Sequence, residues 1–284
     1  EAGTAPAFKP HPSDVFIVTY PKCGTTWMTQ IIHQLRTGGD MDFDEITEVV
    51  PWDIMAYDCG QDLDAAQVGG YPRLFKSHES VERVAQGARY VYVMRSPADA
   101  FISFYYFLPA YMHITPGGIS MEEFAEAIFG GLSHSGGIWD HMVGWWEARH
   151  EKDVLIVCYE DLKADHRREV AKVAAFLGGE AAHPSRQETA VEFSTYEFMS
   201  SHQSQFDDHF VFNHIKDQIG LHSEAEKPGV SKVRAGGGKI GSGSKELPVA
   251  VIDMLRDRWR ATVEAKTGFQ SYEAMRLAVR SLDK

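Results

Sequence analysis

Cysteine is scarce in this 284-residue sequence, which contains three, Cys23, Cys59 and Cys158, and no Cys-x-x-Cys pair. So few cysteines, in odd number, exclude a disulfide framework and a thiolate zinc site, and we predict no bound metal. The scarcity also favours a reducing compartment, so we expect a cytoplasmic protein.

Long hydrophobic runs are missing as well. Stretches such as residues 154–159 fall far short of the roughly 18 residues that a membrane-spanning helix requires. Positive charge is in deficit, with 28 lysines and arginines against 40 aspartates and glutamates and a formal net charge of −12. Such a surface repels nucleic-acid backbones and anionic membranes, so we predict neither as a partner. A small anionic ligand stays possible, because a few cations in one cleft can dominate the local field.

The hydrophobic pattern alternates between strands and helices. Short runs rich in β-branched and aromatic residues indicate buried strands, and stretches with helical spacing separate most of them. Strands that are apolar on both faces and alternate with helices indicate a parallel sheet covered on each side, which is an α/β fold. No repeat or long linker divides the chain, so we expect one domain over residues 1–284, with a tail at residues 1–13. The predicted strands are residues 15–20, 73–77, 90–94 and 154–159. Two predicted helices cover residues 25–35 and 165–177, and a third begins near residue 96.

A helical insertion at residues 121–149 separates the third and fourth predicted strands. It carries Trp139, Trp145 and Trp146, which either pack in the core or form a stacking platform for a ligand. Packing is the commoner role of tryptophan at helical spacing, and we predict it here.

Residues 224–245 differ in composition from the rest of the chain. They contain six glycines together with Lys232, Arg234, Lys239 and Lys245, in an otherwise acidic protein. One interpretation is a disordered surface loop. The other is a mobile lid whose backbone amides and Arg234 close over an anion, and the neighbouring motifs favour this lid.

The sequence YPKCGTTW, residues 20–27, marks the passage from the first predicted strand to a helix. Gly24 lets the backbone approach a ligand, and the N–H groups at the helix start suit an anion that Lys22 and two threonine hydroxyls flank. The ATP-binding pattern G-x-x-x-x-G-K-[ST] is absent because Lys22 precedes the glycine. We therefore predict a phosphate cradle unlike that of an ordinary ATPase.

Three further motifs follow this loop in order along the chain: LFKSH at residues 74–78, YVYVMRSPADAFIS at residues 90–103 and VRAGGG at residues 233–238. Together with residues 19–27 they resemble the cytosolic sulfotransferases that use 3′-phosphoadenosine 5′-phosphosulfate. In that family the four segments correspond to the 5′-phosphosulfate loop, the Lys-Thr-His strand end, the 3′-phosphate strand and helix, and a closing Arg-Lys-Gly loop. The resemblance implies an α/β, P-loop-like three-layer fold with a central parallel sheet flanked by helices, in which residues 224–245 cover the cofactor.

The resemblance implies transfer of a sulfonate from this donor to a hydroxyl or amine of a small-molecule acceptor, with adenosine 3′,5′-bisphosphate as product. Because in-line sulfuryl transfer spreads negative charge, lysines can stabilise it without a metal. His78 would take the proton of the acceptor, Lys22 would neutralise the leaving oxygen, and Lys76 would share the sulfonate. The residues implied to bind the donor are Lys22, Cys23, Gly24, Thr25, Thr26, Trp27, Arg95, Ser103, Tyr159, Ser194, Tyr196, Arg234, Ala235 and Gly236.

The nucleotide roles follow from the same resemblance. Arg95 and Ser103 would bind the 3′-phosphate, and Trp27 and Tyr196 would sandwich the adenine. Ala235 stands where the family usually has a lysine, so one contact to the 3′-phosphate would be either lost or supplied by Lys232 or Lys239. The C-terminal dimer motif of the family is not convincingly present, which leaves the oligomeric state open.

Cys23 stands where the family often has serine. It lies at a helix N-terminus beside Lys22, an environment that lowers the pKa of a thiol. We therefore predict a reactive Cys23 thiol that bound nucleotide protects.

Acidic residues gather near the proposed base. Glu79 follows it directly, and Asp53, Asp58, Asp62 and Asp64 crowd the preceding segment. Either these carboxylates favour a cationic acceptor, such as an amine or guanidinium compound, or they belong to the generally acidic surface.

A second polar cluster could suggest metal binding. Its spacing matches no familiar ligand pattern, so we predict a solvated segment or the rim of the substrate site. The cluster consists of His202, Asp207, Asp208, His209 and His214.

Two other functions remain as alternatives. A nucleotide-dependent kinase of the P-loop class would need a magnesium-holding acid and a Walker lysine, and the loop offers neither. A non-catalytic binding protein would keep the nucleotide site, but intact Lys22 and His78 argue against it.

Overall fold

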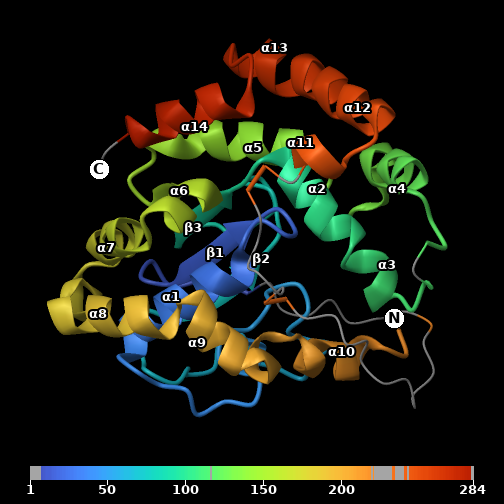
Figure 1. Ribbon diagram of the computed structural model, residues 1–284. Coiled ribbons are helices and arrows are strands. Elements are labelled where there is room, and N and C mark those ends of the chain that lie inside the picture. Colours follow the sequence, from blue (N-terminus) through green and yellow to red (C-terminus); the bar gives the residue numbers. More distant parts are fainter. Residues whose placement is uncertain are drawn as a thin grey trace.

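A parallel sheet with strand order β2-β1-β3-β4 forms the centre of the computed structural model, which describes residues 8–115, 117–218, 220, 232–233, 240–241 and 243–282 (Figure 1). Pairing joins Val15 of β1 to Leu74 of β2 and to Arg89 of β3. The strands are β1 (Val15–Thr19), β2 (Leu74–Ser77), β3 (Arg89–Met94) and β4 (Val154–Cys158). The helices are α1 (Thr25–Thr37), α2 (Pro97–Tyr105), α3 (Leu108–Tyr111), α4 (Met121–Ala127), α5 (Ile138–Glu147), α6 (Tyr159–Ala164), α7 (His166–Leu177), α8 (Pro184–Phe193), α9 (Tyr196–Ser201), α10 (His209–Ile215), α11 (Gly243–Glu246), α12 (Val249–Trp259), α13 (Ala265–Thr267) and α14 (Tyr272–Arg280).

Different helices bury the two faces of the sheet. Successive strand side chains point to opposite faces, so Val15 and Ile17 of β1 join one hydrophobic cluster, whereas Phe16 and Val18 join another. The first cluster includes residues of α1, α7 and α8, and the second includes residues of α5, α12 and α14 (Figure 1). The predicted three-layer α/β fold with a central parallel sheet is therefore confirmed.

The predicted elements differ from the observed ones mainly at their ends. Tyr20 already belongs to a turn and Tyr159 opens α6, so two strands end one residue earlier than predicted. The insertion contains α4 and α5, and Trp139, Trp145 and Trp146 are all buried, which confirms their packing role. Within the described ranges, no helix combines the length and apolar character that a membrane crossing demands.

The carboxyl ends of the four strands lie at one edge of the sheet. From the middle strands the chain proceeds in opposite directions, since β1 leads to the outer strand β2 and β3 leads to the other outer strand, β4. Such a reversal leaves a crevice at the carboxyl edge where open α/β sheets bind ligands. His78, Arg95 and Tyr159 each follow directly after a strand, so the topology places them at this edge.

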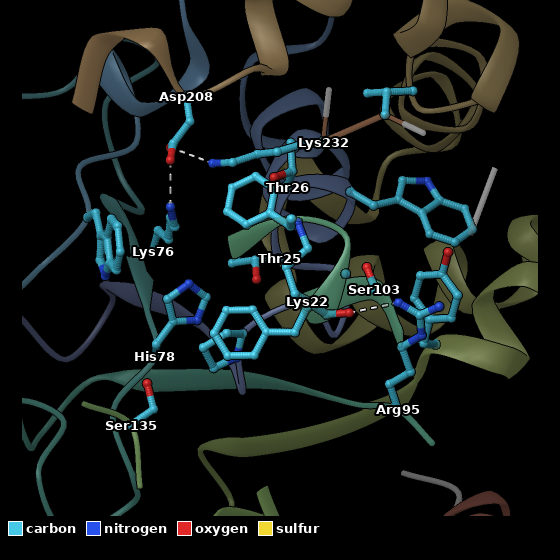
Figure 2. A pocket seen from close by; sticks show the side chains of 18 of the residues that line it. Lys22, Thr25, Thr26, Lys76, His78, Arg95, Ser103, Ser135, Asp208 and Lys232 are labelled. Atoms are coloured by element: carbon cyan, nitrogen blue, oxygen red, sulfur yellow. Dashed lines mark hydrogen bonds and ion pairs between the residues drawn. The ribbon is translucent and has the colours of Figure 1, made fainter. Parts of the chain in front are cut away.

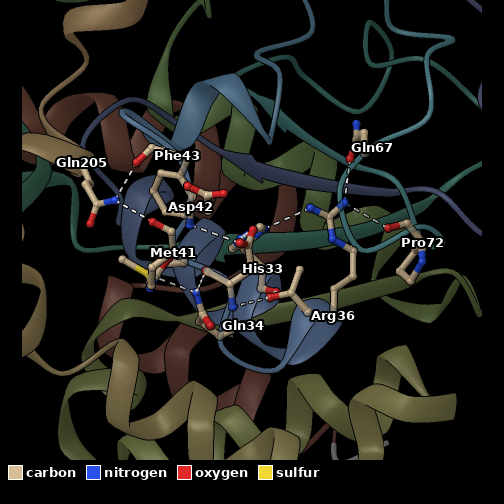
Figure 3. A network of polar contacts seen from close by, with 12 residues as sticks. His33, Gln34, Arg36, Met41, Asp42, Phe43, Gln67, Pro72 and Gln205 are labelled. Carbon is tan, nitrogen blue, oxygen red and sulfur yellow. Dashed lines mark hydrogen bonds and ion pairs between the residues drawn. The ribbon is translucent and has the colours of Figure 1, made fainter.

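A polar network fixes the long connection between α1 and β2 (Figure 3). Near the end of α1, Arg36 donates to the side-chain oxygen of Gln67 at 2.7 Å, and Gln34 donates to the carbonyl of Asp40 at 2.7 Å. Gln205 donates to the carbonyls of Met41 and Phe43 at 3.0 and 2.6 Å. These contacts hold both ends of the connection, whose middle part reaches the carboxyl edge of the sheet.

Candidate functional site

A cavity of about 930 Å³ opens at the carboxyl edge of the sheet (Figure 2). The turn after β1, the ends of β2 and β3, and helices α2, α3, α6, α9 and α10 all contribute to its wall. Twelve of the residues that the sequence identified line it together: Lys22, Gly24, Thr25, Thr26, Trp27, Lys76, His78, Arg95, Ser103, Tyr159, Ser194 and Tyr196. Arg234, Ala235 and Gly236 lie outside the described residues, as does most of residues 224–245.

The turn after β1 has an unusual backbone. Lys22 and Gly24 have φ values of 68° and 101°, in the left-handed region that residues other than glycine rarely adopt. A Cβ atom at Gly24 would lie 2.8 Å from the ring of Tyr159. The N-cap residue of α1 is Gly24, which has no side chain to bond the first turn, and Thr25 and Thr26 of this turn line the cavity. The turn thus presents backbone N–H groups to the cavity, which is the arrangement that holds a phosphate.

Arg95 directly follows β3 and its side chain contacts this turn. Its guanidinium stacks 4.3 Å from the ring centroid of Tyr159, and its Nη1 donates to the carbonyl oxygen of Lys22 at 2.8 Å. Its Nε is buried and has no hydrogen-bond partner among the residues that the structure describes. A buried cationic group with an unused donor, beside Ser103 on the same cavity wall, fits an anionic phosphate.

Two more aromatic side chains, those of Trp27 and Tyr196, line the cavity together with Tyr159. The Trp27 ring packs against it at 5.6 Å between centroids, and the Trp27 indole N–H donates to the carbonyl of Ser194 at 2.7 Å. Tyr196, at the start of α9, keeps 37% of its surface exposed. The hydroxyl of Ser194 donates to the carbonyl of Ala190, so Ser194 shapes this wall mainly through its backbone.

His78 is held as a neutral acceptor of protons. Its Nδ1 lies 2.8 Å from the carbonyl oxygen of Thr19, and because a carbonyl only accepts, Nδ1 carries the hydrogen. Nε2 is then the basic nitrogen of the neutral ring. Burial and the charge of Lys76 hold the pKa of His78 well below 6.5, so the ring is uncharged at neutral pH.

Two lysines approach the cavity from different elements. The Nζ of Lys22 lies 3.6 Å from the ring centroid of Phe107, and the Nζ of Lys76 lies 3.9 Å from that of Trp52. Burial and the charge of Lys232 lower the pKa of Lys76 to about 8. Lys76 therefore carries its charge at neutral pH, beside the neutral His78.

The Cys23 prediction is wrong. Its side chain is 1% exposed and belongs to the cluster that packs the sheet against α5. Burial raises the pKa of its thiol to about 12, so the helix N-terminus does not activate it. The turn directs this side chain into the core and away from the cavity, and its thiol therefore makes no part of the cavity wall.

We expect Cys23 to resist iodoacetamide in the native protein at neutral pH, because the reactive species is the thiolate. Mass spectrometry of alkylated peptides, before and after denaturation in guanidinium, measures this directly, with Cys23→Ser identifying the peptide. Complete alkylation of Cys23 in the native protein within minutes would contradict the buried position.

The acidic residues near His78 do not form an acceptor mouth. Glu79 is buried and pairs with Arg83 at 2.8 Å and with His134 at 3.1 Å, so its charge is neutralised. Burial raises the pKa of Asp53 to about 6. Asp53, Asp58, Asp62 and Asp64 are not among the residues of the cavity wall, which removes the basis for predicting a cationic acceptor.

Asp208 is the residue of the second polar cluster that belongs to the site. It is buried at the cavity wall and forms ion pairs with Lys76 and Lys232, so it is not a solvated residue. His209 instead pairs with Asp44 and Asp207. In the part of the chain that the structure describes, no three His, Cys, Asp or Glu side chains are grouped to hold a metal.

One part of the cavity wall is apolar and was not predicted from the sequence. It faces the same cavity as His78 and consists mainly of aromatic side chains from α2, α3 and the α1–β2 connection. The density of aromatic residues between positions 101 and 111 was a signal that could have identified part of it. The wall includes Trp52, Met55, Phe104, Phe107, Tyr111 and Ile215.

Comparisons with known proteins agree with this geometry. A family model described as a sulfotransferase domain matches residues 12–236. Sulfotransferase 1 family member D1 of Rattus norvegicus is 35% identical over 181 residues, 60% of this chain and 61% of the relative. Sulfotransferase 2A1 of Macaca fascicularis is 31% identical over 198 residues, 67% of each chain. The crystal structure of mouse sulfotransferase SULT7A1 complexed with PAP has a similar fold, with a TM-score of 0.61 at 19% identity, over 89% of this chain and 86% of that chain. The matched part of this chain thus spans about 61% of the length of the rat relative.

Proposed function

Because the chain belongs to the sulfotransferase domain family, we propose that it transfers a sulfonate from 3′-phosphoadenosine 5′-phosphosulfate to a hydroxyl or amine of a small molecule. One observation carries the proposal: a neutral His78 with a basic Nε2 shares a cavity wall with Lys22, Lys76 and the N-terminus of α1. We also propose that residues 1–284 form a single domain around the sheet.

The donor fits the nucleotide side of the cavity. The N-terminus of α1, with Thr25 and Thr26, would hold the 5′-phosphate, and Arg95 with Ser103 would hold the 3′-phosphate. The mouse sulfotransferase of similar fold is complexed with PAP, which supports the same nucleotide here. The donor supplies an activated sulfonate, and the protein supplies positioning and charge.

His78 performs the proton transfer in this proposal. Its Nδ1–H is anchored to the backbone of β1, which fixes the ring and leaves Nε2 to accept the proton of the acceptor hydroxyl or amine. Lys22 and Lys76 stabilise the negative charge that develops on the transferring group and the leaving oxygen. The apolar wall beside these groups seats the carbon skeleton of the acceptor and excludes water.

Titration separates this function from that of a kinase. We expect isothermal titration calorimetry to show tight binding of adenosine 3′,5′-bisphosphate and weak binding of ATP, because Lys22 precedes Gly24 and no Walker lysine follows it. Transfer of labelled sulfonate from the donor to a panel of phenols, alcohols and amines then separates an enzyme from a binding protein. Absence of transfer to every acceptor, with nucleotide binding intact, would contradict the proposed activity.

Arg95 is expected to determine selectivity for the 3′-phosphate. Replacing it with methionine, which keeps an aliphatic stem over Tyr159, should weaken bisphosphate binding about 10- to 100-fold, the loss of one charge-assisted contact. Binding of adenosine 5′-phosphate should change little. Calorimetry on both nucleotides measures the difference, and Arg256→Met, at a half-exposed arginine paired with Asp253, is the matched control. Equal weakening for both nucleotides would exclude this role.

A further inference from the structure

Asp208 is the one acidic side chain among the described residues of the cavity wall. Only 5% of its surface is exposed, and it lies between two ammonium groups (Figure 2). The Oδ1 atom of Asp208 lies 3.7 Å from the Nζ of Lys76 and also forms an ion pair with the Nζ of Lys232. Three segments far apart in the sequence therefore meet at one carboxylate oxygen.

We propose that Asp208 is a positioning residue, whose carboxylate holds the ammonium groups of Lys76 and Lys232 together at the cavity wall near His78. Both lysines then face the transferring sulfonate as cations, and Lys232 becomes a third lysine of the transfer site beside Lys22 and Lys76. This inference rests on the proposed function and adds two residues, Asp208 and Lys232, to its machinery.

The burial of these groups explains why the carboxylate is needed. Lys76 and Lys232 expose 8% and 12% of their side chains, so water screens their mutual repulsion poorly. Without a shared anion, the two ammonium groups would separate or one would lose its proton. The face of Trp52, 3.9 Å from the Nζ of Lys76, supplies weaker support from one side. Asp208 thus keeps both cations in place before the donor, which is itself an anion, arrives.

A role in attracting a cationic acceptor does not fit the same geometry. The single charge of Asp208 is already shared by two ammonium groups. Lys22 adds a third cation that lowers the pKa of Asp208, which is about 2. The local balance is therefore positive and suits an anionic group in transfer.

The two charges beside Lys76 act on its pKa in opposite directions, so we expect opposite shifts when each is removed. Asp208 raises the pKa of Lys76, whereas Lys232 lowers it. Removing the carboxylate should therefore lower that pKa below about 8, and removing the second ammonium should raise it. Other charged or titratable groups face this cluster, and neither variant replaces them: Glu45, Asp53, His78, Lys22 and Cys59.

The variant Asp208→Asn removes the negative charge of the carboxylate and keeps the size of the side chain. Asp208 has φ 76°, a left-handed conformation that asparagine adopts as readily as aspartate, and the two side chains have the same size. Lys232→Gln is the reciprocal variant, and Asp207→Asn changes a neighbouring carboxylate that pairs with His209 instead. The double variant Asp208→Asn/Lys232→Gln removes both charges, and with them the opposing effects on the pKa of Lys76.

Two measurements test the proposal on the full chain. The first is a titration of lysine ¹³Cε resonances by NMR, assigned with Lys76→Gln, and it does not depend on activity. The second is the pH profile of kcat/KM for sulfonate transfer to 2-naphthol, or to the best acceptor of the panel. We expect the pKa of Lys76 and the alkaline limb to move down in Asp208→Asn, up in Lys232→Gln, and back toward the wild-type value in the double variant. We also expect kcat to fall about 10- to 100-fold in Asp208→Asn, with wild-type values throughout for Asp207→Asn.

Each outcome decides between the proposal and its failure. A Lys76 pKa that is the same in wild type, Asp208→Asn and Lys232→Gln would overturn the positioning role, even if transfer slows. Shifts in the same direction for both variants would point to general damage and would also overturn it. If Asp208→Asn does not fold, the upward shift in Lys232→Gln still decides. If wild type transfers no sulfonate while the lysine shifts appear as expected, the charge arrangement stands and the proposed function fails.

Discussion

Replacing His78 with alanine is expected to lower kcat for sulfonate transfer by about 10²- to 10⁴-fold, the usual contribution of a positioned base. Binding of the bisphosphate should stay within about twofold of wild type, because the residues that we propose to hold its phosphates, Thr25, Thr26, Arg95 and Ser103, do not include His78. Steady-state kinetics and calorimetry measure the two quantities. His209→Ala is the matched control, since His209 pairs with Asp44 and Asp207 and does not line the cavity.

The pH dependence gives an independent check on the same residue. The pKa of His78 is held well below 6.5, so Nε2 stays unprotonated while the pH falls through the range in which an ordinary histidine titrates. We expect kcat/KM to stay flat between about pH 7.5 and 6 and to fall only at lower pH. An acid limb centred near pH 6.5, or a His78→Ala variant with wild-type turnover, would exclude His78 as the base.

Replacing Lys22 with methionine should lower kcat by about 100- to 1,000-fold, similar to the loss of a donor in an oxyanion hole. The reason is that Lys22 would stabilise the charge on the leaving oxygen, which develops only during transfer. Lysine and methionine have similar unbranched stems, so the strained φ of 68° affects both alike and the substitution chiefly removes the charge.

Single-turnover kinetics with labelled donor measures the transfer step for Lys22→Met without interference from product release. Lys152→Met is the matched control, because Lys152 exposes 90% of its side chain and is not among the residues of the cavity wall. A Lys22→Met protein that transfers sulfonate at the wild-type rate would show that another group stabilises the leaving oxygen.

The strands and their carboxyl ends could be predicted because each is a short apolar run with one motif directly behind it. A parallel sheet brings such ends to one edge, so the sequence alone was enough to place Lys76, His78 and Arg95 together. The helix after Gly24 was also predictable, since its apolar residues follow helical spacing. Several of these elements differ by one or two residues at their ends, including β1 at Tyr20, β2 at Arg73 and β4 at Tyr159.

Side-chain direction in the turn after β1 could not be predicted. Two residues with positive φ decide which way the Cys23 side chain points, and sequence neighbours alone suggested the helix N-terminus. The partners of Glu79 were equally hidden, because one lies four residues along the chain, at Arg83, and the other at His134. In each case the environment of a titratable group depends on contacts that no local pattern encodes.

The Asp208–Lys232 contact illustrates a different difficulty. Neither residue belongs to a recognisable motif, and the composition of the glycine-rich segment suggested a role at the nucleotide instead. The structure pairs Lys232 and Lys76 with the same carboxylate of Asp208, and this position does not support the interpretation in which Lys232 contacts the 3′-phosphate. Charge composition indicates that an anion is bound but does not indicate which cation meets which part of it.

Gly24 and Tyr159 have a consequence for directed evolution of this chain. A Cβ at position 24 would meet the Tyr159 ring at 2.8 Å, and the φ of 101° adds strain, so libraries of single substitutions there should contain few folded variants. The ring of Tyr159 also stacks on Arg95, so exchanging the tyrosine to make room would disturb that arginine. We therefore expect few substitutions to be tolerated at the turn after β1. Two members of the apolar wall also contact lysines of the site, since the Phe107 ring faces the Nζ of Lys22 and the Trp52 ring faces that of Lys76. A search for new acceptor specificity is therefore best directed to other members of that wall, such as Met55, Phe104 and Ile215.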